Sequence, residues 1–410
     1  MISAVLLLVA PLQSPEWSLP PIEYGKAAPT DAVTKLVQGI ESGDVVIPHD
    51  GAAFSLEGLL DALGVPTSSQ VTVFSRTSMQ AKAITPQRPR ALYFSDDVYV
   101  GYVPDGNLLE ITTVDEREGL VFYSLDRRAP TAESQPQFRR ETHRCLQCHA
   151  TTRSAGMPAH VLRSVHADRR GEPEFGLGSV FMDPSTPYEK RWGGWFVTGN
   201  VGAMAHIGNQ FSAGSRSAIE PSEKPHGNLD DLCQSEHYPT NTSDVVALLV
   251  LEHQTHAQNA IVQASFEARK ALDYQRVLNE MLGEPLDTPV HSTDSRLDRA
   301  AEKVIAALMH SEEVPLPGPI GQDSPFVAAF MGSARRDSRG RSLRDMDLES
   351  RLFRYPLSYT VDSPAFRGLP EPLAKRVWAG LHLALQAEPH FKETLEILKE
   401  TRAAEIPAEW

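Results

Sequence analysis

Residues 90–115 carry the clearest sign of the fold and read RALYFSDDVYVGYVPDGNLLEITTVD. Two runs rich in aromatic and β-branched side chains are separated by the turn residues Asp105-Gly106-Asn107. Short runs of this kind, parted by polar turns, are typical of antiparallel strands. The flanking segments 69–80 and 119–126 have a similar composition. This region therefore predicts a small antiparallel sheet or meander.

The rest of the chain favours helices. Residues 243–278 read SDVVALLVLEHQTHAQNAIVQASFEARKALDYQRVL, with Ser243 as the expected N-cap and apolar residues at helical spacing. Further helices are expected at 295–310, 372–387 and 390–403, and short ones between 34 and 63. We expect an α+β fold, in which a small antiparallel-β N-terminal section (15–135) packs on a mainly α-helical body that binds haem (136–410).

The N-terminus has the character of a targeting segment. Residues 4–12 form an apolar run that is too short to span a bilayer and resembles the core of a secretory signal. No Lys or Arg precedes the run, so a stray apolar segment is the alternative. We expect a signal peptide over residues 1–14 and a periplasmic or otherwise extracytoplasmic protein, with no integral membrane span.

The charge of the chain argues against one class of partner. The 410 residues include 39 basic and 53 acidic side chains, for a formal net charge of −14. The basic residues are spread along the chain rather than clustered. Because nucleic-acid binding needs a basic patch or stripe, nucleic acid is not an expected partner.

The most informative motif lies at residues 142–152, which read THRCLQCHATT. Two of the three cysteines of the chain, Cys145 and Cys148, are followed directly by His149. Cys-x-x-Cys-His is the attachment signature of c-type haem, in which each thiol adds across one vinyl group of the porphyrin. The histidine that follows then lies under the iron as its proximal ligand. The motif predicts one covalent haem c held by Cys145 and Cys148, with His149 on the iron.

Two other kinds of chemistry use closely spaced cysteines. A thioredoxin-like redox pair follows a buried strand and opens a helix, but the preceding residues SQPQFRRETHR do not resemble a buried strand. A zinc site needs a second pair of ligands, which Cys233 and His237 would supply only by a contrived pairing. Both alternatives stay open, and haem attachment is favoured. Because covalent haem attachment takes place outside the cytoplasm, it agrees with the signal-like N-terminus.

The sixth iron ligand has several candidates in the sequence. His206 is ranked first, because it lies 57 residues past His149 in a glycine-rich segment that allows close approach to a flat cofactor. His253 is ranked second, since it falls on the apolar stripe of the long predicted helix. Met204 is ranked third. A satisfied core histidine is the plain alternative for His253.

Four other side chains are weaker candidates for contact with the haem. Trp192 and Trp195 are candidates for the pocket wall, although aromatic core packing is the commoner role. Arg163 and Arg191 are candidates for pairing with the haem propionates.

The motif makes the chain resemble the c-type cytochromes. At larger scale it resembles bacterial proteins with a single cytochrome-c-type haem site, of the kind found in planctomycetes. The segments that carry the resemblance are TSMQAKAITPQRPRALYFSDDVYVGYV, RCLQCHA, RWGGWFVTGNVGAMAHIGN, SDVVALLVLEHQ and GRSLRDMDLESRLFRYPLSY. Only Cys145, Cys148 and His149 carry over with a role. The chain departs from small cytochromes in its length and in the central position of its motif.

These features predict an extracytoplasmic mono-haem cytochrome that carries electrons to or from a redox partner protein or a small-molecule donor or acceptor. Because a bare electron carrier does not need 410 residues, two alternatives stay open. One is a haem-dependent oxidoreductase, peroxidase-like or acting on a small oxidisable molecule. The other is a haem-based ligand sensor.

Overall fold

The structure is a computed structural model of the full chain. It describes residues 15–410, except for 51, 129–130, 132–133, 215–217, 403–405 and 408–409. The expected signal peptide, 1–14, lies outside the described residues.

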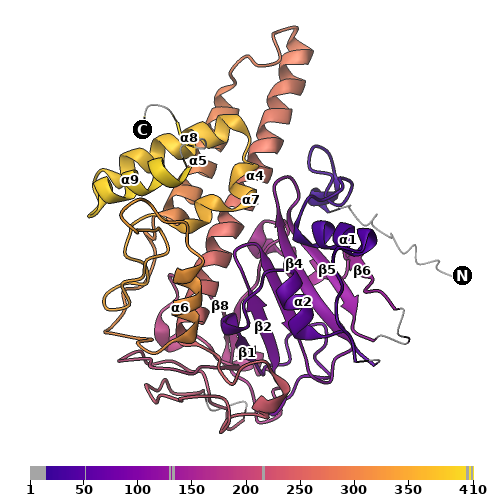
Figure 1. Ribbon diagram of the computed structural model, residues 1–410. Helices are drawn as coiled ribbons and strands as arrows, with labels where there is room; N and C mark the ends of the chain where they lie inside the picture. Colours follow the sequence, from indigo (N-terminus) through magenta and orange to yellow (C-terminus); the bar gives the residue numbers. More distant parts are fainter. Residues whose placement is uncertain are drawn as a thin grey trace, which may run out of the picture.

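The described chain contains a seven-stranded sheet and a set of helices. Figure 1 shows how the helices are arranged around the sheet. Its strands are β1 (Val71–Val73), β2 (Arg90–Phe94), β3 (Val98–Tyr102), β4 (Leu108–Asp115), β5 (Gly119–Asp126), β6 (Phe138–Arg140) and β9 (Trp195–Phe196), while β7 (Arg163–Val165) and β8 (Ser179–Phe181) form a separate pair. The α-helices are α1 (Ala32–Ser42), α2 (Leu56–Ala62), α3 (Leu146–His149), α4 (Val245–Leu282), α5 (His291–Leu308), α6 (Pro325–Gly332), α7 (Pro364–Arg367), α8 (Glu371–Leu385) and α9 (Phe391–Arg402). Short 3-10 helices lie at Glu16–Ser18, Thr67–Ser69, Thr152–Ser154, Phe175–Leu177, Tyr188–Lys190, Ser235–His237 and Tyr359–Asp362.

The sheet is antiparallel throughout, in the order β6-β5-β4-β3-β2-β1-β9. The predicted meander and the α+β class are therefore confirmed. The β4–β5 turn closes at Gly119, whose φ of 69° is left-handed and favours glycine. A Cβ at Gly119 would also collide with Val262 of α4, so the glycine lets the sheet approach that helix closely.

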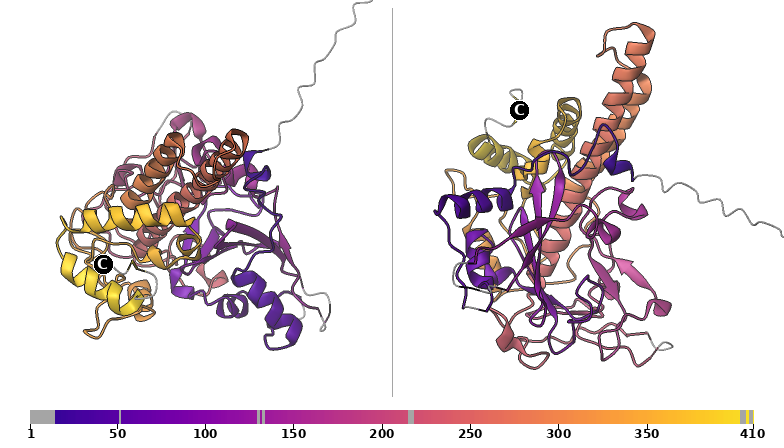
Figure 2. Two further views of the ribbon diagram at one scale, coloured as in Figure 1. Left: turned by 90° about the horizontal axis from the view of Figure 1, so that it is seen from above. Right: turned by 90° about the vertical axis from the view of Figure 1, so that its right-hand side faces the viewer.

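Each face of the sheet is covered by different elements. One core joins α1 and α2 to the sheet, through Leu36 and Leu60 against Tyr93 and Ile111. The opposite face contributes Phe122 to a larger core that takes in α4, α5 and α8. Figure 2 shows the resulting layers, with α1 and α2 on one side of the sheet and the helical body on the other.

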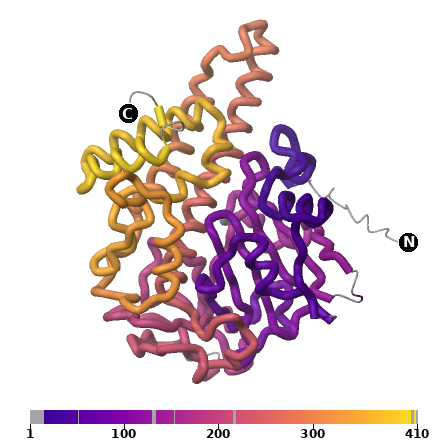
Figure 3. Tube along the Cα trace, viewed as in Figure 1, coloured from indigo at the N-terminus to yellow at the C-terminus, as the bar shows by residue number. Residues whose placement is uncertain are grey.

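The long helix α4 is the axis of the helical body. It packs along α5, and α5 in turn packs against α8. The outer ends of α4 and α5 project beyond the rest of the molecule (Figures 1 and 2). Between β9 and α4 the chain takes a largely irregular path, which Figure 3 shows looping across the lower end of the molecule.

The helices can be compared with those that span membranes. None of them, in the described part of the chain, has the length and apolar character that crossing a bilayer requires.

Candidate functional site

The Cys-x-x-Cys-His motif folds into one helical turn. Helix α3 begins directly after Cys145, whose carbonyl oxygen accepts hydrogen bonds from the amides of Cys148 (3.1 Å) and His149 (3.0 Å). Leu146 is 3% exposed and anchors the turn in the core, while Cys148 is exposed. The turn therefore presents both thiols and the imidazole from one short, anchored piece of chain.

The ring of His149 is held in one orientation. Its Nδ1 lies 2.8 Å from the carbonyl oxygen of Ala159, and because that oxygen can only accept, Nδ1 carries the proton. The ring also packs on Phe122, with 4.9 Å between the ring centroids. Burial lowers the pKa of His149 below its ordinary value. The imidazole is therefore neutral at pH 7, with its Nε2 lone pair left to bind a metal, as in a metal-ligating histidine whose second nitrogen is fixed by a carbonyl.

A cavity of about 400 Å³ adjoins the motif and is lined by Cys145, Cys148 and His149 together. Volumes of about 300–1,000 Å³ are usual for sites that hold cofactors and comparable ligands. The apolar wall of the cavity comes from the seven-stranded sheet, from β8 and from the chain after the motif. Its residues are Val73, Leu92, Ile111, Phe122 and Trp195 of the sheet, Phe181 of β8, and Val161. Trp195, a candidate for the pocket wall, lines this cavity, and its Nε1 donates to the carbonyl oxygen of Arg163 at 2.8 Å.

Three arginines also line this cavity: Arg90, Arg144 and Arg163. Arg90 pairs with Glu110 at 2.5 Å, and Arg163 lies over the rings of Phe175 and Phe181. An apolar slot with nearby guanidinium groups suits a flat cofactor that carries carboxylate groups. The residues present therefore fit a haem.

The same geometry disfavours thiol redox chemistry. Burial, together with the nearby carboxylates of Glu141 and Glu110, raises the pKa of Cys145 to about 11. A redox-active cysteine needs a lowered pKa, because the thiolate is the nucleophile. Among the described residues, the motif joins no group of three or more metal-binding side chains, which also disfavours a zinc site there.

His206 is buried, at 2% exposure, but it is not among the residues that line the cavity beside the motif. Its Nδ1 accepts a hydrogen bond from the Gly208 amide at 3.0 Å, and its ring packs edge-on against Trp192 at 5.1 Å. Burial lowers the pKa of His206 to about 4. Met204 is also fully buried outside the cavity.

His253 is likewise outside the cavity beside the motif. Both of its ring nitrogens have partners: Nδ1 lies 2.7 Å from Oε1 of Glu313, and Nε2 lies 2.7 Å from the Ser358 hydroxyl. Burial lowers the pKa of His253 to about 4. The structure therefore brings neither predicted histidine together with His149.

Arg191 and Trp192 also lie away from the motif. The Arg191 guanidinium donates to Glu252 at 2.6 Å, and the Trp192 indole donates to the other oxygen of that carboxylate at 2.6 Å. All three residues are buried. The cluster joins the segment after β8 to helix α4, and it does not contribute to the cavity beside the motif.

Met79 is a cavity residue that the sequence analysis did not single out. Its side chain is 43% exposed, lines the cavity with His149, and has its sulfur 3.1 Å from a guanidinium nitrogen of Arg144. A thioether is a common axial ligand of haem iron. The signal in the sequence was weak: Met79 is an isolated apolar side chain in the polar stretch SRTSMQAK, without a core periodicity to explain it.

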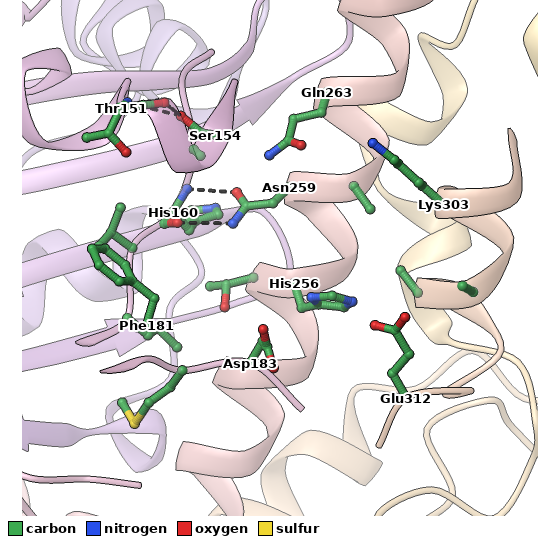
Figure 4. A pocket seen from close by; sticks show the side chains of 18 of the residues that line it. Thr151, Ser154, His160, Phe181, Asp183, His256, Asn259, Gln263, Lys303 and Glu312 are labelled. Atoms are coloured by element: carbon green, nitrogen blue, oxygen red, sulfur yellow. Dashed lines mark hydrogen bonds between the residues drawn. The ribbon is translucent and has the colours of Figure 1, made fainter. Parts of the chain in front are cut away.

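A second cavity of about 510 Å³, with polar and apolar residues in its lining, adjoins the first, since Thr151, Val161 and Phe181 line both. Figure 4 shows His160 tied to Asn259 of α4, with Lys303 and Glu312 on the opposite side. The His160 amide donates to Asn259 at 2.8 Å, and the Asn259 amide group donates back at 3.0 Å. His256 and Gln263 of α4 complete the polar wall. This space can accept a small polar molecule next to the motif.

No family model, curated protein or solved structure matches this chain. The site is therefore defined by its own geometry: two thiols and an oriented imidazole on one turn, beside a cavity with apolar walls and three arginines.

Proposed function

We propose that this protein is a mono-haem c-type cytochrome that transfers electrons outside the cytoplasm. Its haem is bound covalently by Cys145 and Cys148, and its iron is bound by His149. One observation carries the proposal: the three residues of the motif line a single cavity of cofactor size.

Each part of the chain has a role in this proposal. The Ala159 carbonyl holds the His149 ring through Nδ1, so Nε2 is the nitrogen that would bind the iron. The apolar walls would exclude water from a porphyrin bound here, and the arginines would offset the charge of its propionates. A haem bound here supplies one-electron chemistry at its iron. The exposure of Cys148 places one edge of the site at the surface, where a redox partner can approach.

Expression of the full chain in a bacterial host that carries the c-type haem attachment machinery tests the proposal. We expect the polypeptide to gain the mass of one haem and to show a Soret band after denaturation. Cys145→Ser and Cys148→Ser should each weaken attachment, and the double variant should abolish it. Cys233→Ser is the matched control, since Cys233 does not line the cavity. A wild-type chain with the mass of the bare polypeptide and no Soret band would refute haem attachment.

The second cavity beside the motif, about 510 Å³ in volume, favours a second candidate function, a haem enzyme or a ligand sensor. The two candidates are separated by the spectrum of the holoprotein. A six-coordinate low-spin haem that does not bind carbon monoxide indicates electron transfer. A haem that binds carbon monoxide readily indicates the alternative, and turnover with peroxide then separates an enzyme from a sensor.

A further inference from the structure

A second cluster of metal-binding side chains lies away from the Cys-x-x-Cys-His motif. His253 from α4, His310 just after α5, and Glu313 each offer one ligand atom, and these atoms lie within 4.8 Å of one another. Both histidine side chains are nearly inaccessible, at 1% and 2% exposure. The described residues show no other group of this kind.

The spacing of these atoms is close to that of a metal coordination sphere. Oε1 of Glu313 lies 2.7 Å from Nδ1 of His253 and 2.9 Å from Nδ1 of His310. Ligands at right angles around an ion with bonds of about 2.0–2.1 Å are about 2.9 Å apart, and tetrahedral ligands are about 3.3 Å apart. The two distances to Oε1 of Glu313 are therefore close to those between ligands that share one ion, and the two imidazole nitrogens lie within 4.8 Å of each other.

The surroundings also resemble those of a metal site. Nε2 of His253 lies 2.7 Å from the Ser358 hydroxyl, which is the kind of outer contact that orients a ligating imidazole. A cavity of about 190 Å³ is lined by all three residues, which leaves room for water or a small ligand on the open side of an ion.

We infer that His253, His310 and Glu313 bind a divalent first-row transition-metal ion. Two imidazoles and one carboxylate with open positions suit Zn²⁺ or Fe²⁺. The neighbouring Glu252 does not complete the set, because both of its oxygens are engaged by Arg191 and Trp192. The site is independent of haem attachment, since its ligands lie on α4 and on the segment after α5.

The test uses the purified full-length protein. Metals are removed with a chelator, Zn²⁺ is restored, and bound metal is counted per chain by mass spectrometry of the elements, with haem iron subtracted. We expect one Zn²⁺ per chain and a rise in the melting temperature on adding Zn²⁺. Glu313→Gln and His310→Ala should weaken Zn²⁺ binding by more than about tenfold. Loss of a residue that only hydrogen-bonds to a metal ligand already lowers metal affinity by about tenfold or more, and loss of a ligand should cost more. The matched control is Glu312→Gln, because Glu312 is an exposed neighbour.

Two results would overturn the inference. One is a wild-type protein that retains no Zn²⁺ after desalting and shows no change in melting temperature. The other is metal bound equally well by wild type and Glu313→Gln. If the variants do not fold, X-ray absorption at the zinc edge of the wild type decides: two imidazoles and one carboxylate oxygen in the first sphere support the site, and any sphere without two imidazoles overturns it.

Discussion

At the scale of the residue, the sequence is most informative where partners are adjacent in the chain. Cys145, Cys148 and His149 lie on one turn, so their spacing alone predicts a joint role. Periodicity also predicts that His253 faces inward, and it is 1% exposed. The partner of His253 is Glu313, which is 60 residues away in the chain. No local pattern reveals that pairing, so the ranking of His253 as an iron ligand depended on burial alone.

The cavity makes Met79 the first residue to test as the sixth iron ligand. Of the four candidates Met79, Met204, His206 and His253, Met79 alone lines the cavity with His149. We expect the holoprotein with Met79→Ala to lose low-spin character and the red charge-transfer band of methionine-ligated ferric haem, and to bind carbon monoxide. His206→Ala and His253→Ala should leave the spectrum unchanged.

Met281→Ala is the control for the loss of a methionine, because Met281 is 80% exposed at the end of α4. An unchanged spectrum for Met79→Ala would contradict this assignment. A change of spin state in His206→Ala would restore the ligand that the sequence ranks first.

At the scale of the element, composition and periodicity predict most helices and strands, with errors at their ends. The long helix was expected to begin after Ser243, but its N-cap is Asp244, whose carboxylate accepts from the amides of Val246 and Ala247. Ser243 has a different role: its hydroxyl accepts from the Thr72 amide at 2.8 Å and donates to the Phe196 carbonyl at 2.6 Å. The prediction of the N-cap was wrong because the sheet, which is distant in sequence, uses Ser243.

We expect Asp244→Ala to lower the free energy of unfolding by about 1 kcal/mol, the usual cost of losing an N-cap. Asp244→Asn should retain most of the stability, since asparagine caps helices about as well. Urea unfolding followed by circular dichroism measures both values, with the exposed Asp287→Ala as a control. Equal stability of Asp244→Ala and wild type would show that the cap is dispensable.

At the scale of the whole molecule, the contacts that assemble the fold are the least visible in the sequence. Strand β9 has two residues and joins the sheet by pairing Thr72 with Phe196. A run of two residues gives no strand periodicity, so its place in the sheet could not be predicted. Strands β6 and β9 both follow residue 135, so segments on both sides of the expected boundary complete one sheet.

Gly368, at the end of α7, tests how closely the helical body and the sheet must approach. A Cβ at this position would lie inside van der Waals contact with the carbonyl oxygen of Glu116, in the β4–β5 turn. Because backbone cannot move aside as a side chain can, Gly368→Ala should lower the free energy of unfolding by about 1–3 kcal/mol. Gly332→Ala is the matched control: a Cβ there meets nothing within 4 Å, and alanine should be neutral or mildly stabilising. Urea denaturation of both variants measures their free energies of unfolding. Equal values for Gly368→Ala and Gly332→Ala would contradict the close approach of Gly368 to the Glu116 carbonyl.

The whole molecule should also lose stability in mild acid, because full or partial burial keeps several of its histidines neutral. Burial lowers the pKa of His160 to about 3 and lowers the pKa values of His149, His206 and His253. In the unfolded chain these groups take up protons near pH 6.5. The stability that their neutral burial provides is therefore complete above about pH 6.5 and is lost as the pH falls toward the folded values.

Two buried acids oppose this trend without cancelling it. Burial raises the pKa values of Asp97 and Glu252 to about 7, so in the folded protein these two acids take up about 1.6 protons between pH 8 and pH 6. The four histidines of the unfolded chain take up about 2.9 protons over the same range. A net difference of one to two protons corresponds to roughly 1.5–3 kcal/mol of stability lost per pH unit near pH 5.5.

Urea unfolding at pH 7.5 and pH 5.5 measures the loss. His160→Gln should reduce the slope by about 1.4 kcal/mol per pH unit, and the exposed His291→Gln should leave it unchanged. Equal stability of the wild type at both pH values would contradict the neutral burial of these histidines.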